Sequence, residues 1–224
     1  MLKFNDIDLA EMGVLVVEDF PIPTSQLRYE EQVIPGRDGV ITITDGSYEG
    51  CEITGRVVIR LNDNYTLDDI KRVLHGWGRL MIPGVEDRYF IAKVNNLIPI
   101  EQFIKNEVYE LPLTFKCQPF GYLLSGYEEV DVTSGMVTNL GNVVARPTFI
   151  CTSAGSVGIA INGRTFTTTA TEGTIIDCEL EEVIDVTNST LVASNGTFPY
   201  LDLGTNEISI TAGTFKVQWN WRCL

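Results

Sequence analysis

At 224 residues with 44% hydrophobic side chains, the chain can form one large or two small domains and bury a core, which excludes a disordered protein. The formal charge is −14 and neither half has a basic cluster, so phosphates would not be neutralised and we expect no nucleic-acid binding. No apolar run approaches the roughly 20 residues that cross a bilayer, and the first residues do not read as a signal peptide, so we expect no membrane insertion and synthesis in a reducing cytoplasm.

Cysteine usage points to free thiols. The five cysteines are scattered, and none belongs to a C-x-x-C pair; they are Cys51, Cys117, Cys151, Cys178 and Cys223. An odd number without paired spacing argues against a disulfide framework and against a structural zinc site. We therefore expect buried free thiols and neither a metal nor a cofactor.

Extended segments and one sharp turn dominate the first 50 residues. Val14–Val17 is predicted to be a strand, and the two prolines in Asp19–Pro23 forbid a helix there. In Ile34-Pro35-Gly36-Arg37-Asp38-Gly39, the proline presets φ and the glycines supply angles that other residues reach only at a cost. The β-branched run Val40–Thr44 follows, so the local pattern predicts a hairpin loop leading into a strand.

One amphipathic helix is predicted near residues 66–78. Thr66 is a good N-cap, and Asp69 three residues later completes an Asp version of the capping box. The apolar residues at helical spacing are Leu67, Ile70, Val73, Leu74 and Trp77, and glycines at 76 and 78 end the pattern. We expect this stripe to dock the helix on a sheet, with Trp77 buried at the junction.

Strands are predicted on both sides of this helix. Glu52–Leu61 places Ile53, Val57, Ile59 and Leu61 on one face, and the slip at Gly55 indicates a bulge. Asp87–Val94 and Val108–Cys117 follow, and the second of these directs Tyr109, Leu111, Leu113 and Phe115 to the core. The predicted core of the first half therefore combines Phe115 with Leu67, Ile70, Leu74 and Trp77.

The composition changes after Tyr122: charges become fewer, and threonine and glycine rise. Short β-rich segments recur about every 8–12 residues, as in a β-sandwich. Asn162-Gly163 is a strong type I′ hairpin signal, and the last predicted strand is Thr214–Arg222. We place the boundary near Glu128–Val132, which gives an N-terminal domain at 1–130 and a C-terminal sandwich at 131–224.

No group of residues has the pattern of a catalytic site. His75 is the only histidine, and no serine has the context of a nucleophile elbow. The acidic residues at 177, 179 and 181 alternate as on a solvated strand face. Trp219 and Trp221 would share a face on one strand, which suits either a sandwich core, which we favour, or a sugar-stacking platform. We therefore expect no enzyme.

Several segments, taken in order, resemble the distal tail protein (Dit) family of long-tailed, non-contractile bacteriophages and prophages. They are Ile34–Gly39, the helix closing on His75-Gly76-Trp77, Asp87–Val94, Phe115–Tyr122, Gly141–Pro147 leading into the Thr-rich half, Asn206–Ile208 and Trp219–Trp221. Their order and spacing cover nearly the whole chain.

The resemblance implies a mainly β fold: an N-terminal ring-forming (belt) domain with one α-helix, then a galectin-like or carbohydrate-module-like antiparallel β-sandwich. It implies a structural hub at the virion tail tip, made in the bacterial host cytoplasm and assembled as a homo-hexamer. The partners would be the tail tube protein, the tape measure protein and a tail-associated fibre or lysin protein. Residues 34–39 would be candidates for contacts between subunits.

The sequence leaves other points open. Family members that grip receptor-binding proteins directly carry a long arm in the sandwich, and residues 131–224 contain only short loops, so this contact stays open. A carbohydrate-binding module with a β-rich partner domain is the alternative function, with Trp219 and Trp221 as its sugar-platform candidates. A glycan hydrolase would need two carboxylates facing each other across a cleft, such as one including Glu181.

Overall fold

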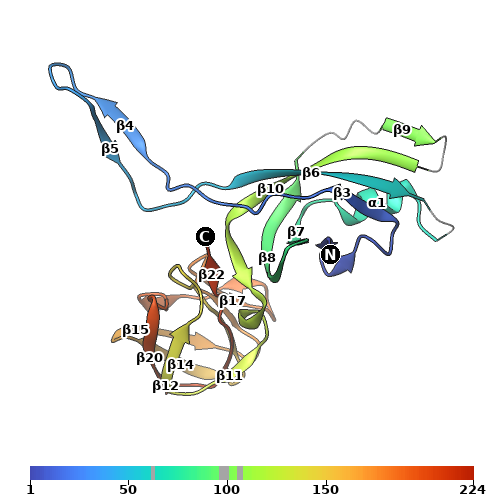
Figure 1. The fold of residues 1–224 in the computed structure, drawn as a ribbon. Helices are drawn as coiled ribbons and strands as arrows, with labels where there is room; N and C mark the ends of the chain where they lie inside the picture. Colours follow the sequence, from blue (N-terminus) through green and yellow to red (C-terminus); the bar gives the residue numbers. More distant parts are fainter. Residues whose placement is uncertain (62–63, 96–100, 105–107) are drawn as a thin grey trace. The chain divides into compact units, whose positions relative to one another are not determined.

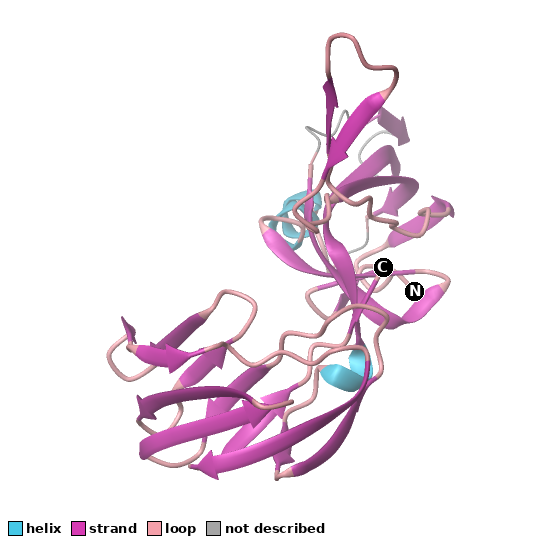
Figure 2. Ribbon diagram, turned by 90° about the vertical axis from the view of Figure 1, so that its left-hand side faces the viewer, coloured by secondary structure: helices cyan, strands magenta, loops and turns pink. Residues whose placement is uncertain are grey.

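The computed structural model describes residues 1–61, 64–95, 101–104 and 108–224. The chain forms two compact units, the first made of residues 1–121 with Leu224 and the second of residues 122–223. Strands make up most of both units, as predicted (Figures 1 and 2). Each unit is described by itself below.

The first unit is built on one antiparallel sheet. Its main path runs β2-β1-β7-β8-β10-β6-β3, and β9 pairs with the start of β10. The strands are β1 Lys3–Phe4, β2 Ile7–Asp8, β3 Val14–Glu18, β6 Cys51–Arg60, β7 Trp77–Ile82, β8 Val85–Val94, β9 Glu101–Ile104 and β10 Val108–Leu123. The predicted strands at 14–17, 52–61, 87–94 and 108–117 are thereby confirmed.

The pairing of β6 with β10 corrects one prediction. The ladder is unbroken from Val108 opposite Arg60 to Cys117 opposite Cys51, so there is no bulge at Gly55. Gly55 lies on the buried face of β6. A Cβ at this position would lie 2.8 Å from ring carbons of Phe20. The glycine leaves room for an aromatic ring that reaches it from the Asp19–Pro23 segment.

The helix α1 covers Leu67–Val73 and is the only α-helix among the described residues. Its capping box is confirmed: the Asp69 N–H donates to Thr66 Oγ1 at 3.3 Å, and the Thr66 N–H donates to Asp69 Oδ2 at 2.9 Å. Ile70 and Leu74 are buried, and Leu67 packs against the same cluster while partly exposed.

Trp77 is where the helix prediction was wrong. The helix ends at Val73, Gly76 takes a positive φ of 81°, and Trp77 begins β7 opposite Lys93. Its side chain is 47% exposed, with Lys93 Nζ 5.2 Å from the ring centroid. Trp77 is therefore a surface residue of a strand, and Leu80 and Ile82 are the buried residues of β7.

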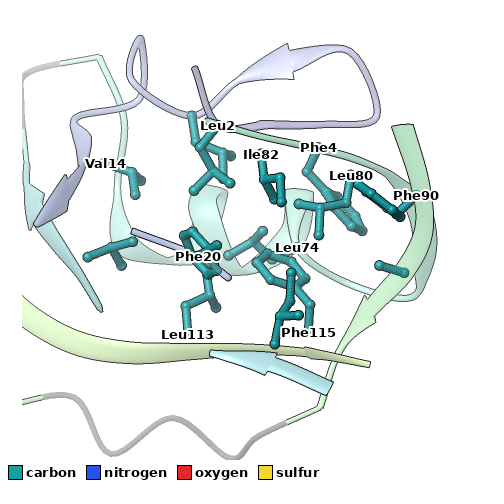
Figure 3. Packing of buried hydrophobic residues seen from close by; sticks show 14 of the residues in the cluster. Leu2, Phe4, Val14, Phe20, Leu74, Leu80, Ile82, Phe90, Leu113 and Phe115 are labelled. Carbon is teal, nitrogen blue, oxygen red and sulfur yellow. The ribbon is translucent and has the colours of Figure 1, made fainter. Parts of the chain in front are cut away.

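Figure 3 shows the core of the first unit, with side chains from several strands and the helix facing one another. Phe115 is fully buried, as predicted. Its ring lies 6.0 Å from that of Phe4 and 5.7 Å from that of Phe20, between centroids. The core thus joins the N-terminal segment to the central strand β10.

The second unit is a sandwich of two antiparallel sheets, as expected for the C-terminal half. One sheet has the order β11-β21-β13-β16-β17-β18 and the other β12-β20-β14-β15-β19. Its elements are the 3₁₀ turn η1 Leu124–Gly126, β11 Val130–Val132, β12 Gly135–Asn139, β13 Thr148–Cys151, β14 Gly155–Ile161, β15 Arg164–Ala170, β16 Ile175–Asp177, β17 Glu182–Asp185, β18 Thr190–Leu191, β19 Ser194–Gly196, β20 Gly204–Ala212, β21 Phe215–Gln218 and β22 Arg222–Cys223.

Turn chemistry explains two details of the sandwich. Asn162 and Gly163 both have positive φ, 50° and 79°, so the predicted type I′ hairpin joins β14 to β15. The predicted last strand is interrupted, because Asn220 has a φ of 49° and its side chain donates to the Arg146 carbonyl at 3.2 Å. That break separates β21 from β22.

Candidate functional site: an exposed hairpin arm

The most distinctive surface feature is a hairpin that we call the arm, residues 26–49. Its strands are β4, Glu30–Val33, and β5, Val40–Ile43, paired with Glu30 opposite Ile43 and Val33 opposite Val40. The predicted turn connects them: Gly36 and Gly39 have φ of 85° and 81°. Among the described strands, β4 and β5 pair only with each other, and Figure 1 shows them as a separate ribbon.

The base of the arm is tied to the body of the first unit. The ladder continues below β4 and β5, where the Arg28 N–H donates to the Ser47 carbonyl at 2.7 Å and the Glu49 N–H to the Gln26 carbonyl at 2.8 Å. The Tyr48 ring lies 5.5 Å from that of Phe120 on β10, between centroids. These contacts hold the outgoing and returning segments of the arm where they leave the body of the first unit.

A second turn sits within the arm at Asp45. Its carboxylate accepts the Ser47 hydroxyl at 2.6 Å and the Ser47 N–H at 2.8 Å. Hydrogen bonding from the Ser47 side chain, and then from its backbone, holds the pKa of Asp45 below its usual value. The carboxylate therefore holds this turn closed.

The rest of the arm carries both charged and apolar side chains, and its large apolar side chains are uncovered. All residues of the predicted interface segment 34–39 are exposed. Large apolar side chains in the arm are exposed as well: Leu27, Tyr29, Val33, Ile34, Val40 and Ile43, with Val33 74% exposed. A two-stranded hairpin is marginally stable by itself in water. A ribbon that exposes several large apolar side chains is typical of a segment that contacts another surface.

A second exposed apolar segment lies at the edge of the main sheet. β3 pairs only with β6 among the described strands, so its other edge is open. Leu15 and Val17 on this strand are 53% and 62% exposed, and Ile22 after it is 61% exposed. An open edge with apolar side chains can add a strand from another chain.

The residues considered for chemistry do not converge. His75 is exposed. The acidic segment is a turn between β16 and β17, which corrects the predicted strand face: Asp177 Oδ1 accepts the N–H groups of Glu179 and Leu180 at 2.9 and 3.0 Å. Glu181 bonds Arg146 at 2.9 Å instead of facing a second carboxylate. No three His, Cys, Asp or Glu side chains in the described part of the chain could share a metal ion.

The two candidate sugar-platform residues face the sandwich core. Trp221 is only 3% exposed, and Trp219 packs against the same cluster. Their rings stack on each other, with centroids 5.4 Å apart and planes 8° apart. A sugar cannot stack on Trp221 there. A separate shallow pocket lies on the five-stranded sheet. It is lined mostly by hydroxyl, amide and small side chains, such as Ser156, Thr167 and Asn195, and by no aromatic ring on which a sugar could stack.

Among the described residues, no helix is long and apolar enough to span a membrane. No family model matches the sequence, and no curated protein is detectably similar to it. Solved structures do match the chain, and two of them, both from phages, are described here.

The first is the Dit protein of phage SPP1, described as a paradigm of the hub adsorption apparatus in phages that infect Gram-positive bacteria. It is 18% identical, covers 96% of each chain and gives a TM-score of 0.61. The baseplate of phage p2 in its activated conformation with Sr is 12% identical, covers 94% of this chain and 92% of that chain, and gives a TM-score of 0.42. This chain therefore has the fold of SPP1 Dit along nearly its whole length, as the resemblance in its motifs predicted.

Proposed function

We propose that the chain is a structural hub of a phage tail tip, a ring that joins the distal end of the tail tube to the host-adsorption apparatus. The observation that carries this proposal is the shared fold with SPP1 Dit over 96% of both chains. The exposed arm supports it independently, because uncovered large apolar side chains on a protruding hairpin suit a protein that works in an assembly. The proposed role needs no catalytic group.

The arm is the proposed contact between neighbouring subunits, with the segment Ile34–Gly39 at its tip. Its exposed apolar side chains would be covered by the next copy, and the ordered base would fix the direction in which the arm leaves the body. In the proposed contact the tip of one copy meets a different patch of the next copy, and a head-to-tail contact of this kind forms a ring when its rotation closes. A six-fold ring is the closure that the resemblance implies.

The proposed partners follow from the hub role. They are the tail tube protein above the ring, and a tail-associated fibre or lysin protein and the tape measure protein at its other contacts, in a virion built inside the bacterial host cell. A direct contact with receptor-binding proteins is not part of the proposal. The alternative, a carbohydrate-binding module, is not favoured, because Trp221 is buried and the partly exposed Trp219 stacks on it and packs against the core.

The first test is the native mass of the purified chain. A species near six times 24.9 kDa, seen as a ring by negative-stain microscopy, would support the hub. A monomer would move the test to mixtures with tail tube and tail-associated proteins. Failure to join any of them would overturn the proposal.

The arm is tested by replacing residues 34–39 with Asn-Gly. A two-residue Asn-Gly loop still lets Val33 pair with Val40, so the ribbon is kept and only its tip is lost. The matched control is Leu180→Lys with Leu191→Glu, at two apolar residues of the sandwich that are 63% and 70% exposed. Loss of assembly in the first variant but not in the control is expected. Equal assembly of both would remove the tip of the arm from the interface.

A further inference from the structure

Two of the free cysteines lie directly opposite each other in the main sheet. Cys51 begins β6 and faces Cys117 of β10 in the antiparallel ladder, next to the Glu52–Lys116 pair. Both side chains point to the buried face that also carries Ile53 and Phe115. This pairing is not visible in the spacing of the sequence, where 65 residues separate the two cysteines.

The geometry of the pair meets the requirements of a disulfide. Directly opposed residues in an antiparallel ladder have Cα atoms about 4.5 or 5.5 Å apart. Both values fall within the roughly 4.4–6.8 Å seen across disulfides. Both thiols are free in this structure. Only a small approach of the two Cβ atoms is needed to bring the sulfurs into bonding distance.

The other three cysteines do not offer such a pair. They all belong to the second unit, where Cys151 faces Phe215 in its ladder. Cys178 lies just after the end of β16 and is fully buried. Cys223 lies on β22. Selective oxidation of Cys51 with Cys117 is therefore the expected outcome, rather than random cross-linking.

The pair sits at the base of the arm. Cys51 directly follows Gly50, where the returning chain of the arm comes so close to β10 that a Cβ on Gly50 would lie 2.5 Å from the Cys117 carbonyl oxygen. On the other side, Ser25, just before the outgoing strand of the arm, donates its hydroxyl to the Pro119 carbonyl of β10. A covalent bond at this point would fix the base of the arm to the central strand of the body.

We propose that Cys51 and Cys117 form a cross-strand disulfide when the protein meets a low-molecular-weight disulfide such as oxidised glutathione. The thiolate of Cys51 attacks one glutathione sulfur, which breaks the S–S bond and releases one glutathione thiolate. The thiolate of Cys117 then attacks Cys51 Sγ in the mixed disulfide and releases the second. The two protein thiols lose two protons and two electrons, and one molecule of oxidised glutathione is reduced to two of glutathione.

The order of attack follows from exposure. Cys51 is partly exposed, whereas Cys117 is buried and shielded from the reagent. Burial raises the pKa of Cys51, and burial followed by the neighbouring Cys51 raises that of Cys117 to about 12. Thiolates are scarce at neutral pH, so the reaction should be slow and should accelerate as the pH is raised toward 9. The proposal does not depend on the function proposed above.

The test treats the full chain with oxidised glutathione at pH 8, then measures intact mass in denaturant and counts thiols. We expect a loss of two hydrogen atoms, a fall from five free thiols to three, and a peptide joining Cys51 to Cys117 after proteolysis. Cys117→Ala should instead trap glutathione on Cys51, because the resolving thiol is missing. Cys151→Ala, which removes a buried cysteine of the second unit, should leave the cross-link intact.

Two results would overturn the proposal. One is that Cys51 and Cys117 both stay unmodified after prolonged treatment with oxidised glutathione. The other is that each of them carries a separate glutathione adduct. A second measurement needs no variant: the unfolding midpoint of the oxidised chain should fall when a reductant is added, because the cross-link closes a long loop in the unfolded state. An unchanged or higher midpoint after reduction would count against a disulfide that the native geometry accepts.

Discussion

Replacing Gly55 with alanine tests the packing of the first unit where sequence reasoning and structure disagree. A Cβ at this position would lie 2.8 Å from three ring carbons of Phe20, closer than real contacts allow. The ring cannot simply move away, since Phe20 is 4% exposed and its centroid lies 5.7 Å from that of Phe115. The added methyl group must therefore displace an aromatic ring from the core.

Two effects of opposite sign compete. Gly→Ala stabilises by about 0.4–1 kcal/mol where the backbone accepts it, because the unfolded chain loses freedom. Overpacking a well-filled core costs about 1–3 kcal/mol. We expect overpacking to win and Gly55→Ala to destabilise the first unit by about 1–2 kcal/mol. That corresponds to a fall of roughly 4–8 °C in its unfolding midpoint.

Differential scanning calorimetry measures this fall, and Gly135→Ala is the matched control. Gly135 also lies in a strand, has no heavy atom within 4 Å of its ideal Cβ and does not have a positive φ. The control should be neutral or slightly stabilising. The double variant Gly55→Ala with Phe20→Leu should recover part of the loss, because a smaller side chain leaves room for the methyl group. A stabilising Gly55→Ala would refute the assignment of Phe20 to this face.

Three further predictions concern stability. Phe115→Ala should lower the free energy of unfolding, measured by chemical denaturation, by about 3–5 kcal/mol, since the ring is fully buried. Trp77→Ala should lower it by less than half as much, because that side chain is 47% exposed. Equal losses would contradict the surface position of Trp77. Thr66→Ala should cost about 1 kcal/mol by removing the helix cap, and Thr66→Ser should restore it. The side-chain and then the backbone hydrogen bonds from Thr66 hold the pKa of Asp69 below its usual value. Its contribution is thus present above about pH 4 and lost as the pH falls further; an Asp69→Asn variant that keeps the full acid sensitivity of the parent would exclude this carboxyl as a source.

Local signals predicted the parts of the fold that depend on local chemistry. The capping box at Thr66 and the Asn162-Gly163 hairpin need only neighbouring residues, and both are present. Phe115 was identified from alternation along one strand and is fully buried. The turn of the arm was also predicted, because proline and glycine restrict or extend φ whatever surrounds them.

Features that depend on distant residues were missed or misplaced. Trp77 continues the helical spacing of Leu74, but Gly76 at positive φ lets the chain turn into β7, and pairing with Lys93 places the ring outside. Gly55 was interpreted as a bulge, because its neighbours in the sequence do not show that the ring of Phe20 packs over it. No spacing rule could show that Cys51 and Cys117 are opposed, since that depends on the register of two strands.

Because the tip of the arm is exposed, limited proteolysis can measure how far the chains have assembled. Arg37 lies in the tip between Gly36 and Asp38, in a loop of the kind that proteases cut first. Cleavage there should leave the body folded, because Phe4 and Phe20 before the cut pack against Phe115 after it. Trypsin should thus convert free chains into nicked but folded ones, and a copy whose tip is covered by a neighbour should stay intact. The fraction of chains that stay uncut after Arg37 would then measure the fraction of tips that a neighbour covers.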